Sequence, residues 1–81
     1  MTNCTISANM TKEQCRMARA GLKWSLDKLA EESGVARRSI AAFEAGSNVR
    51  SDTVSSLALT LVGAGVAFLE TDHGRGVLIK V

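Results

Sequence analysis

The chain has 81 residues, none of them proline, and only 4% of its residues are aromatic. Because proline interrupts helices, its absence favours a helical protein with short connections. Hydrophobic residues make up 46% of the chain, and the core must be built mainly from Ala, Leu, Val and Ile. This composition argues against disorder, and the length allows one domain with one modest core.

Cysteine and histidine are scarce, which excludes several kinds of site. Cys4 and Cys15 form neither a disulfide framework nor a C-x-x-C spacing, so we interpret both as free thiols in a reducing, cytoplasmic compartment. His73 is the single histidine and has no Cys or second His nearby, so no metal site is expected. No grouping of Ser, His and Asp suggests a charge-relay triad. We therefore predict neither enzymatic activity nor a cofactor.

The chain also lacks a long hydrophobic run. The most apolar stretch, residues 57–69, spans 13 residues and contains Gly63 and Gly65, whereas a membrane-spanning helix needs about 20. We interpret this stretch as a buried helix followed by a strand. The N-terminus has no basic region followed by an apolar run, so we expect no signal peptide and no membrane association.

Positive charge is in slight excess and is unevenly distributed. The net charge is +2, and residues 12–38 hold seven Lys or Arg against four acidic residues, whereas residues 39–81 hold three against four. Such a mild excess does not identify a partner by itself. It does place the cations in the N-terminal half.

Capping residues and hydrophobic spacing predict two helices in that half. Thr11 and Gln14 form a T-x-x-Q capping box, which starts a helix over residues 12–20. Ser25 is the N-cap of a second helix over residues 26–33. We expect the residues before this pair to be flexible.

Two further helices and a hairpin follow. The third helix covers residues 36–45, and the fourth begins at an N-cap, Ser51, and ends at Gly63-Ala64-Gly65. Residues 66–69 and 77–79 are then predicted to be strands, joined by a glycine-containing loop at 71–76.

Residues 25–46 hold the pattern that points to a function. Two short amphipathic helices joined by a tight turn at Gly34 cross at a steep angle, with Leu29, Val35 and Ile40 in the wedge between them. The second helix then exposes the side opposite its apolar stripe. The side chains on that side are Arg37, Arg38, Ala41 and Ala42.

This stretch resembles the helix-turn-helix of the phage repressor and Cro family, also called the xenobiotic-response-element type. The matching residues are Trp24-Ser25, Leu29-Ala30, Gly34-Val35, Ile40 and Glu44-x-Gly46. The resemblance covers about residues 11–81 and extends to small bacterial and prophage regulators. It implies a mainly α fold, a four-helix repressor/Cro-like domain with a C-terminal β-hairpin. The expected division is a flexible N-terminus at 1–10, the DNA-binding domain at 11–63 and the hairpin at 64–81.

The resemblance implies that the second helix of the motif lies in the major groove of double-stranded DNA. Base readout then falls to Arg37, Arg38, Ala41 and Ala42, and it stays open which arginine reads a base. Glu44 is expected to form an ion pair with Arg19. Phosphate contacts are expected from Arg19, Lys23, Ser25, Ser39, Ser47, Asn48 and Arg50. We expect Lys12, Arg16, Lys23 and Lys28 to be surface charges, of which one or two contact phosphate.

The chain departs from the family pattern at three positions. Leu26 replaces a glutamine that binds phosphate, and Ala36 replaces a Ser or Thr N-cap. The second change leaves unfilled a cap worth about 1 kcal/mol. Arg50 replaces a proline and offers a phosphate contact in return. Together, Leu26 and Ala36 weaken the case for tight binding.

The hairpin predicts a homodimer. Val66, Phe68, Val77 and Ile79 alternate onto one face, and Ala67, Leu69 and Leu78 onto the other, so both faces are apolar. We expect two subunits to share a sheet through Val66, Phe68, Leu69, Val77, Leu78 and Ile79. The alternative is that one face packs on the helices and the other is simply exposed. A dimer places two recognition helices roughly 34 Å apart and so predicts a palindromic operator.

The sequence therefore predicts a sequence-specific transcriptional regulator, with repression as the expected action. No small-molecule ligand is indicated. The alternative is a protein-interaction module or an antitoxin that retains the helix-turn-helix scaffold.

Overall fold

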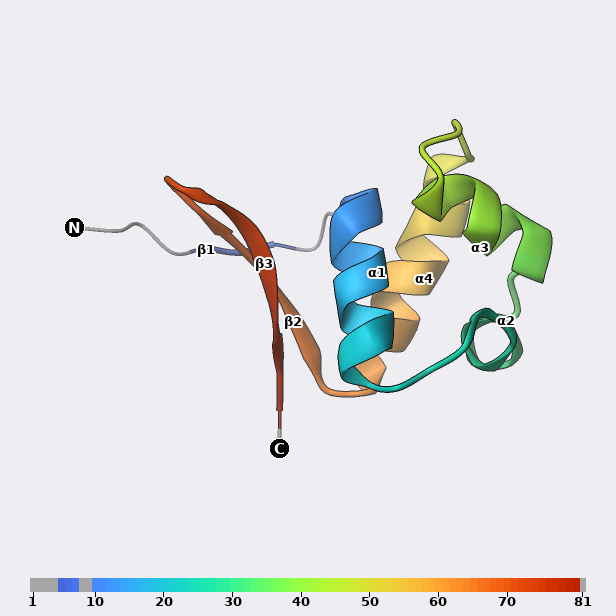
Figure 1. The fold of residues 1–81 in the computed structure, drawn as a ribbon, viewed down its shortest axis with the longest axis horizontal. Coiled ribbons are helices and arrows are strands. Elements are labelled where there is room, and N and C mark those ends of the chain that lie inside the picture. Colours follow the sequence, from blue (N-terminus) through green and yellow to red (C-terminus); the bar gives the residue numbers. More distant parts are fainter. Residues whose placement is uncertain (1–4, 8–9, 81) are drawn as a thin grey trace.

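The computed structural model describes residues 5–7 and 10–80, and its helices and strands are labelled in Figure 1. The four helices are α1 (Lys12–Gly21), α2 (Leu26–Ser33), α3 (Arg37–Glu44) and α4 (Ser51–Gly63). The three strands are β1 (Thr5–Ser7), β2 (Val66–Thr71) and β3 (Gly74–Ile79). This architecture confirms the mainly helical fold with a C-terminal hairpin.

The strands form one antiparallel sheet in the order β1-β2-β3. Thr71 pairs with Gly74, so the connection between β2 and β3 has two residues rather than the six predicted. The strand β1 was not predicted, and it pairs with β2 through Ile6 and Leu69. Its three residues are too few to show an alternating pattern, and their partner strand lies at the far end of the chain. The rest of the segment expected to be flexible, apart from Met10, lies outside the described residues.

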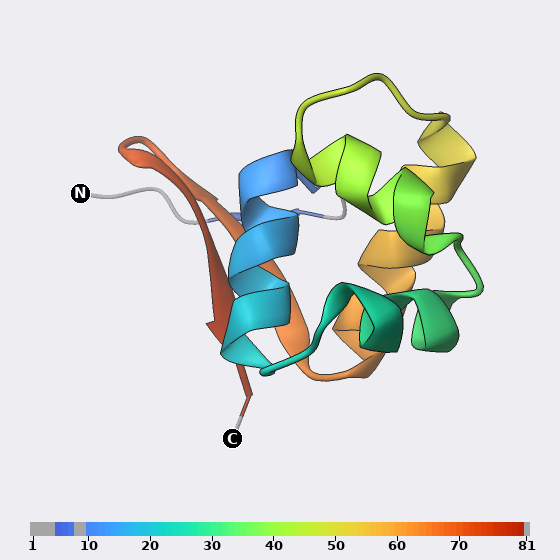
Figure 2. The same ribbon diagram turned by 45° about the vertical axis from the view of Figure 1, so that its right-hand side comes forward.

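The helices separate the sheet from the helix-turn-helix. In Figures 1 and 2 the sheet lies on one side of α1, and α2 and α3 lie on the other; in Figure 2, α4 lies behind α2 and α3. The helix α1 packs on β3, and α4 packs on β2. The core between these layers is made of Met10, Cys15, Ala18, Leu29, Ile40, Leu57, Ala58, Leu61, Val66 and Phe68.

The helix ends follow their capping residues. Thr11 and Gln14 form the predicted capping box, and the Ser25 hydroxyl accepts a hydrogen bond from the Lys28 N–H at 3.0 Å. Ala36 is the N-cap of α3 and makes no side-chain cap, as expected from its methyl group. The prediction for α4 was wrong by one residue. Ser51 is the first residue of that helix, and Arg50 lies at the N-cap without a side-chain hydrogen bond.

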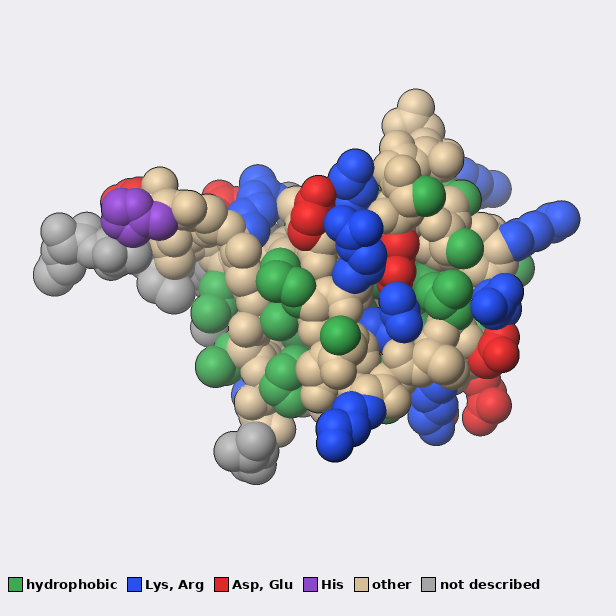
Figure 3. Space-filling view, viewed as in Figure 1, with side chains coloured by type: hydrophobic (Ala, Val, Ile, Leu, Met, Phe, Trp, Pro, Cys, Tyr) green, Lys and Arg blue, Asp and Glu red, His purple; other side chains and the backbone are tan. Residues whose placement is uncertain are grey.

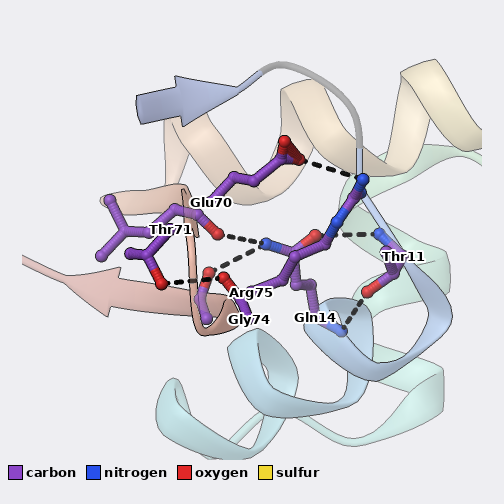
Figure 4. Close-up of polar contacts among 8 residues, drawn as sticks. Thr11, Gln14, Glu70, Thr71, Gly74 and Arg75 are labelled. Atoms are coloured by element: carbon purple, nitrogen blue, oxygen red, sulfur yellow. Dashed lines mark hydrogen bonds and ion pairs between the residues drawn. The ribbon is translucent and has the colours of Figure 1, made fainter. Parts of the chain in front are cut away.

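Gln14 joins the first helix to the sheet, as Figure 4 shows. Its side chain is buried, and its Oε1 accepts a hydrogen bond from the Thr11 N–H at 3.0 Å. Its Nε2 donates to the carbonyl oxygens of Leu69 at 3.1 Å and Gly76 at 2.9 Å. One amide therefore closes the cap of α1 and ties both strands of the hairpin to it.

None of the helices in the described part of the chain is both long enough and apolar enough to cross a membrane.

Candidate nucleic-acid interface

The turn between α2 and α3 is held by buried side chains on both helices. Leu29 and Ile40 are fully buried, and Val35 packs against them. Gly34 has a φ of 75° and donates its N–H to the Ala30 carbonyl at 3.0 Å, which ends α2 in the left-handed conformation that glycine favours. This wedge confirms the predicted packing. Because Ile40 faces inward, the opposite side of α3 faces outward.

The outward side of α3 carries the residues predicted to read bases. Arg37 and Arg38 are exposed, whereas Ala41 and Ala42 are half-buried. Both arginines lie in the first turn of the helix, directly after Ala36, the N-cap residue without a side-chain hydrogen bond. A helix of this diameter fits a B-DNA major groove, and in helix-turn-helix proteins the residues at the start of the second helix are the ones that contact base edges.

The structure distinguishes the two arginines by their partners. The Arg37 Nε lies 2.8 Å from Oδ1 of Asp27 in the first turn of α2, and both side chains are mostly exposed. Arg38 has no ion pair with any residue that the structure describes. Asp27 was missed by the sequence analysis. An acid in the first turn of a helix is ordinarily explained by the helix dipole, so nothing in the pattern pointed to Arg37.

The expected ion pair between Arg19 and Glu44 is present and joins α1 to α3. Arg19 Nη2 donates to Glu44 Oε1 at 2.8 Å, and Arg19 Nε donates to Oε2 at 3.0 Å. Arg19 Nη1 also donates to the Trp24 carbonyl at 3.1 Å. The hydrogen bond to Glu44 raises the pKa of Arg19. Three of the five guanidinium N–H groups are therefore used within the subunit, and the other two have no hydrogen bond to a described residue.

Cys15 is a further member of this network that the sequence did not reveal. Its thiol is fully buried and donates to Glu44 Oε2, with Sγ 3.4 Å from the oxygen. Burial, and then the charge of Glu44, raise the pKa of Cys15 to about 12. The thiol thus stays protonated and helps to satisfy a buried carboxylate.

The other residues predicted to contact phosphate lie around the ends of α2, α3 and α4. Lys23 and Ser25 are exposed beside the start of α2, and Ser39 is half-buried in α3. The exposed side chains in and beside the loop between α3 and α4 are Ser47, Asn48 and Arg50. Arg50 is paired with Asp52, with Nη2 3.0 Å from Oδ2.

Basic side chains also gather on α1. Figure 3 shows Lys and Arg side chains in a column over α1 and again near α2 and α3, whereas green hydrophobic side chains flank the sheet. Lys28 extends over the Trp24 ring, with Nζ 5.7 Å from the ring centroid, and also pairs with Glu32 at 3.1 Å.

The structure shows where the residues of the predicted dimer set lie within one subunit. Val66 and Phe68 belong to the core of the subunit itself, and Val77 and Ile79 pack against that core. One face of the hairpin therefore covers the helices, as the alternative interpretation held for that face. Leu69 and Leu78 are on the other face, where Leu78 is 54% exposed.

The comparisons with known proteins agree with this geometry. The model of a helix-turn-helix family, HTH_3, matches residues 16–61, which is more than half of the chain. The match runs from within α1 into α4 and contains the whole α2-turn-α3 unit. A search of curated proteins gave no match. The chain therefore belongs to the Cro/C1-type helix-turn-helix family, whose members are DNA-binding regulators.

Proposed function

We propose that the protein is a sequence-specific transcriptional repressor that inserts α3 into the major groove of a palindromic operator as a homodimer. The observation that carries this proposal is the packing of Leu29 and Ile40, which turns the arginine-bearing side of α3 outward on a helix-turn-helix scaffold. Repression follows from occupancy, because a dimer that covers two adjacent half-sites blocks access to that DNA.

Arg38 is the main base-reading residue in this proposal. Its guanidinium has no ion-pair partner among the described residues, so it reaches the O6 and N7 atoms of a guanine without breaking a contact. Arg37 must give up or share Asp27 to do the same. Ala41 and Ala42 offer methyl groups, which suit a thymine methyl or a close approach of the backbone.

Phosphate contacts flank the recognition helix. Lys23 and Ser25 lie on the α2 side, and the exposed loop from Ser47 to Arg50 lies on the α4 side. Arg19 has two N–H groups left for the backbone, and Glu44 holds its guanidinium in place. Contacts of this kind set the register of the protein on DNA without reading its sequence.

The homodimer is proposed to form through β3. Among the described residues β3 pairs only with β2, so its outer edge has backbone N–H and C=O groups ready for another strand. Leu78 is exposed beside this edge. A second copy of β3, paired antiparallel about a twofold axis, provides hydrogen-bond partners for the backbone groups of this edge and covers the exposed leucine.

Selection of binding sites from random duplex DNA tests the readout. The unmodified protein is expected to enrich a palindrome with a guanine in each half-site. Arg38→Ala is expected to relax the preference at that guanine, whereas Arg37→Ala has a smaller effect. An unchanged preference after Arg38→Ala would show that the base-reading assignment is wrong.

Sedimentation equilibrium tests the dimer. Leu78→Lys is expected to shift the protein towards monomer, because it places a charge beside the paired edge. Leu59→Lys is the matched control, since Leu59 is 73% exposed on α4, away from β3. A dimer that survives Leu78→Lys but not Leu59→Lys would move the interface to α4.

A further inference from the structure

We propose that Lys12 and Arg16 of α1 bind the sugar-phosphate backbone and so extend the DNA contact beyond the helix-turn-helix. This inference rests on the proposed function and assigns a second surface of the same protein to the same partner. The sequence left both residues among several surface charges of which one or two contact phosphate, and the positions of Lys12 and Arg16 single them out.

The two cations lie in one row with Arg19. Residues 12, 16 and 19 are spaced i, i+4 and i+7 in α1, a spacing that places their side chains on one face of a helix. Figure 3 shows the resulting column of Lys and Arg side chains over this helix. Lys23 follows just beyond the end of α1 and is exposed.

Apart from Arg19, which is bound to Glu44, the cations of this row have no ion pair among the described residues. Lys28, Arg37, Arg50 and Arg75 are each paired with an exposed or half-exposed acid. Within the described part of the chain, Lys12, Arg16 and Lys23 have no such pair, although Glu13 lies on the same helix. Neighbouring cations without acidic partners, such as Lys12 and Arg16, form the kind of surface that attracts a polyanion.

The row runs past the C-terminal end of α3. Arg19 is bound to Glu44, the last residue of that helix. The Lys12 ammonium lies beside Gly46. If that glycine had a Cβ atom, the atom would be 2.9 Å from the Lys12 Nζ. Gly46 leads into the exposed residues Ser47 and Asn48. The α1 row is therefore continuous with a loop already proposed to contact phosphate.

The size of α3 places this row at the wall of the groove. Eight residues form a helix about 12 Å long, and the major groove of B-DNA is about 12 Å wide. When Arg37 and Arg38 at the start of α3 reach base edges, cations beyond its other end lie near the phosphates that border the groove. This geometry points to backbone binding rather than base readout by Lys12 and Arg16.

The salt dependence of binding measures such contacts. Each phosphate neutralised by a cation contributes about −0.9 to the slope of log K against log salt concentration. Lys12→Gln and Arg16→Gln are each expected to make the slope shallower by about 0.9 per bound subunit. Both are expected to weaken binding to the selected site and to an unrelated duplex by the same factor, because no base contact is lost.

Lys80→Gln is the matched control, because it removes one exposed positive charge from the end of the hairpin, outside α1. The experiment is a fluorescence anisotropy titration of the full chain at several salt concentrations, with thermal unfolding to verify that each variant is folded. Arg16 is exposed, so Arg16→Gln serves if Lys12→Gln unfolds. Shallower slopes for the α1 variants, with the control unchanged, support the inference.

Equal slopes for the two α1 variants, the control and the unmodified protein overturn the inference. If Arg38→Ala still relaxes base preference in that case, the proposed function stands without the α1 surface. Absence of duplex binding by the unmodified protein at low salt overturns both.

Discussion

At the scale of single residues, the charged groups differ most in how far they are removed from water. Glu44 is 7% exposed, and its two oxygens accept hydrogen bonds from Arg19 and Cys15. A buried carboxylate is costly unless it is paired and hydrogen-bonded. The exposed pair of Arg37 and Asp27 contributes little to stability by comparison. In the proposed function, the effect of this pair is to leave Arg38 rather than Arg37 as the main base-reading arginine.

Removal of Arg19 tests the buried pair. Arg19→Met is expected to lower the free energy of unfolding by about 3–5 kcal/mol, because it leaves the Glu44 carboxylate buried without its cation. The double variant Arg19→Met, Glu44→Met is expected to lose less, since no charge is then left in the interior. Urea unfolding of both variants measures the difference. A double variant that is less stable than the single one would contradict this explanation.

The Cys15 thiol predicts a dependence of stability on alkaline pH. Its folded-state pKa is about 12, against an ordinary value of 9.0. Above about pH 9 the unfolded chain releases a proton that the folded chain keeps, so the stability from this group is lost as the pH rises from 9 towards 12. In a Cys4→Ser background, the free energy of unfolding should fall more steeply with rising pH than it does with an added Cys15→Ala. If the free energy of unfolding fell equally with pH in the two proteins, the Cys15 thiol would not be buried and protonated in the folded state.

At the scale of elements, α1 ends at a position where glycine would suit the backbone conformation but the sequence has a lysine, Lys23. The Trp24 N–H donates to the Arg19 carbonyl at 2.9 Å, and the Lys23 N–H donates to the Ala20 carbonyl at 3.0 Å. This is a Schellman motif, whose left-handed residue is usually glycine. Here that residue is Lys23, with a φ of 60°. The strain is explained if the position needs a cation for DNA.

Lys23→Gly is therefore expected to raise the free energy of unfolding by about 1 kcal/mol while it weakens binding to all DNA sequences alike. The control is Lys23→Ala, which removes the same charge but keeps the strained backbone, so it should weaken binding without the gain in stability. Thermal unfolding and anisotropy titrations provide the two readouts. A glycine variant that is less stable than the alanine variant would show that the left-handed backbone at residue 23 is not strained.

The helices and strands also show how much of the fold could be predicted from the sequence alone. The helices were placed within a residue or two, because Thr11, Ser25 and Gly34 act on backbone groups only a few residues away. The two-residue hairpin connection was not foreseen, because its length depends on pairing across strands. The strand β1 was missed for the same reason. Its partner, β2, lies more than sixty residues further along the chain.

A contact within the candidate site could be predicted from the sequence where both residues match positions of the family pattern. It could not be predicted where it depends on how the side chains are oriented in the fold. The Arg19–Glu44 pair followed from the resemblance. The Cys15–Glu44 and Arg37–Asp27 contacts did not, since neither residue type nor spacing singles them out. The predicted dimer set stays a prediction, because alternation shows that two faces of the hairpin are apolar but not which one the helices cover.

At the scale of the whole molecule, the protein has two opposite sides. The sheet, tied to α1 by the buried Gln14 amide, lies opposite the recognition helix. A dimer formed through β3 would therefore set the separation of its two α3 helices by the rigidity of that connection. The basic row on α1 lies between these two sides and widens the surface offered to DNA.

The central claim is that the Arg38 guanidinium enters the major groove, and base-analogue substitution tests it most directly. The selected duplex is compared with one that carries 7-deazaguanine, which lacks the N7 acceptor, at the guanine of each half-site. The account predicts that the unmodified protein loses about tenfold in affinity per half-site. Arg38→Ala, already lacking the contact, should bind both duplexes equally. Equal binding of the two duplexes by the unmodified protein, or an equal loss by the variant, would contradict the claim.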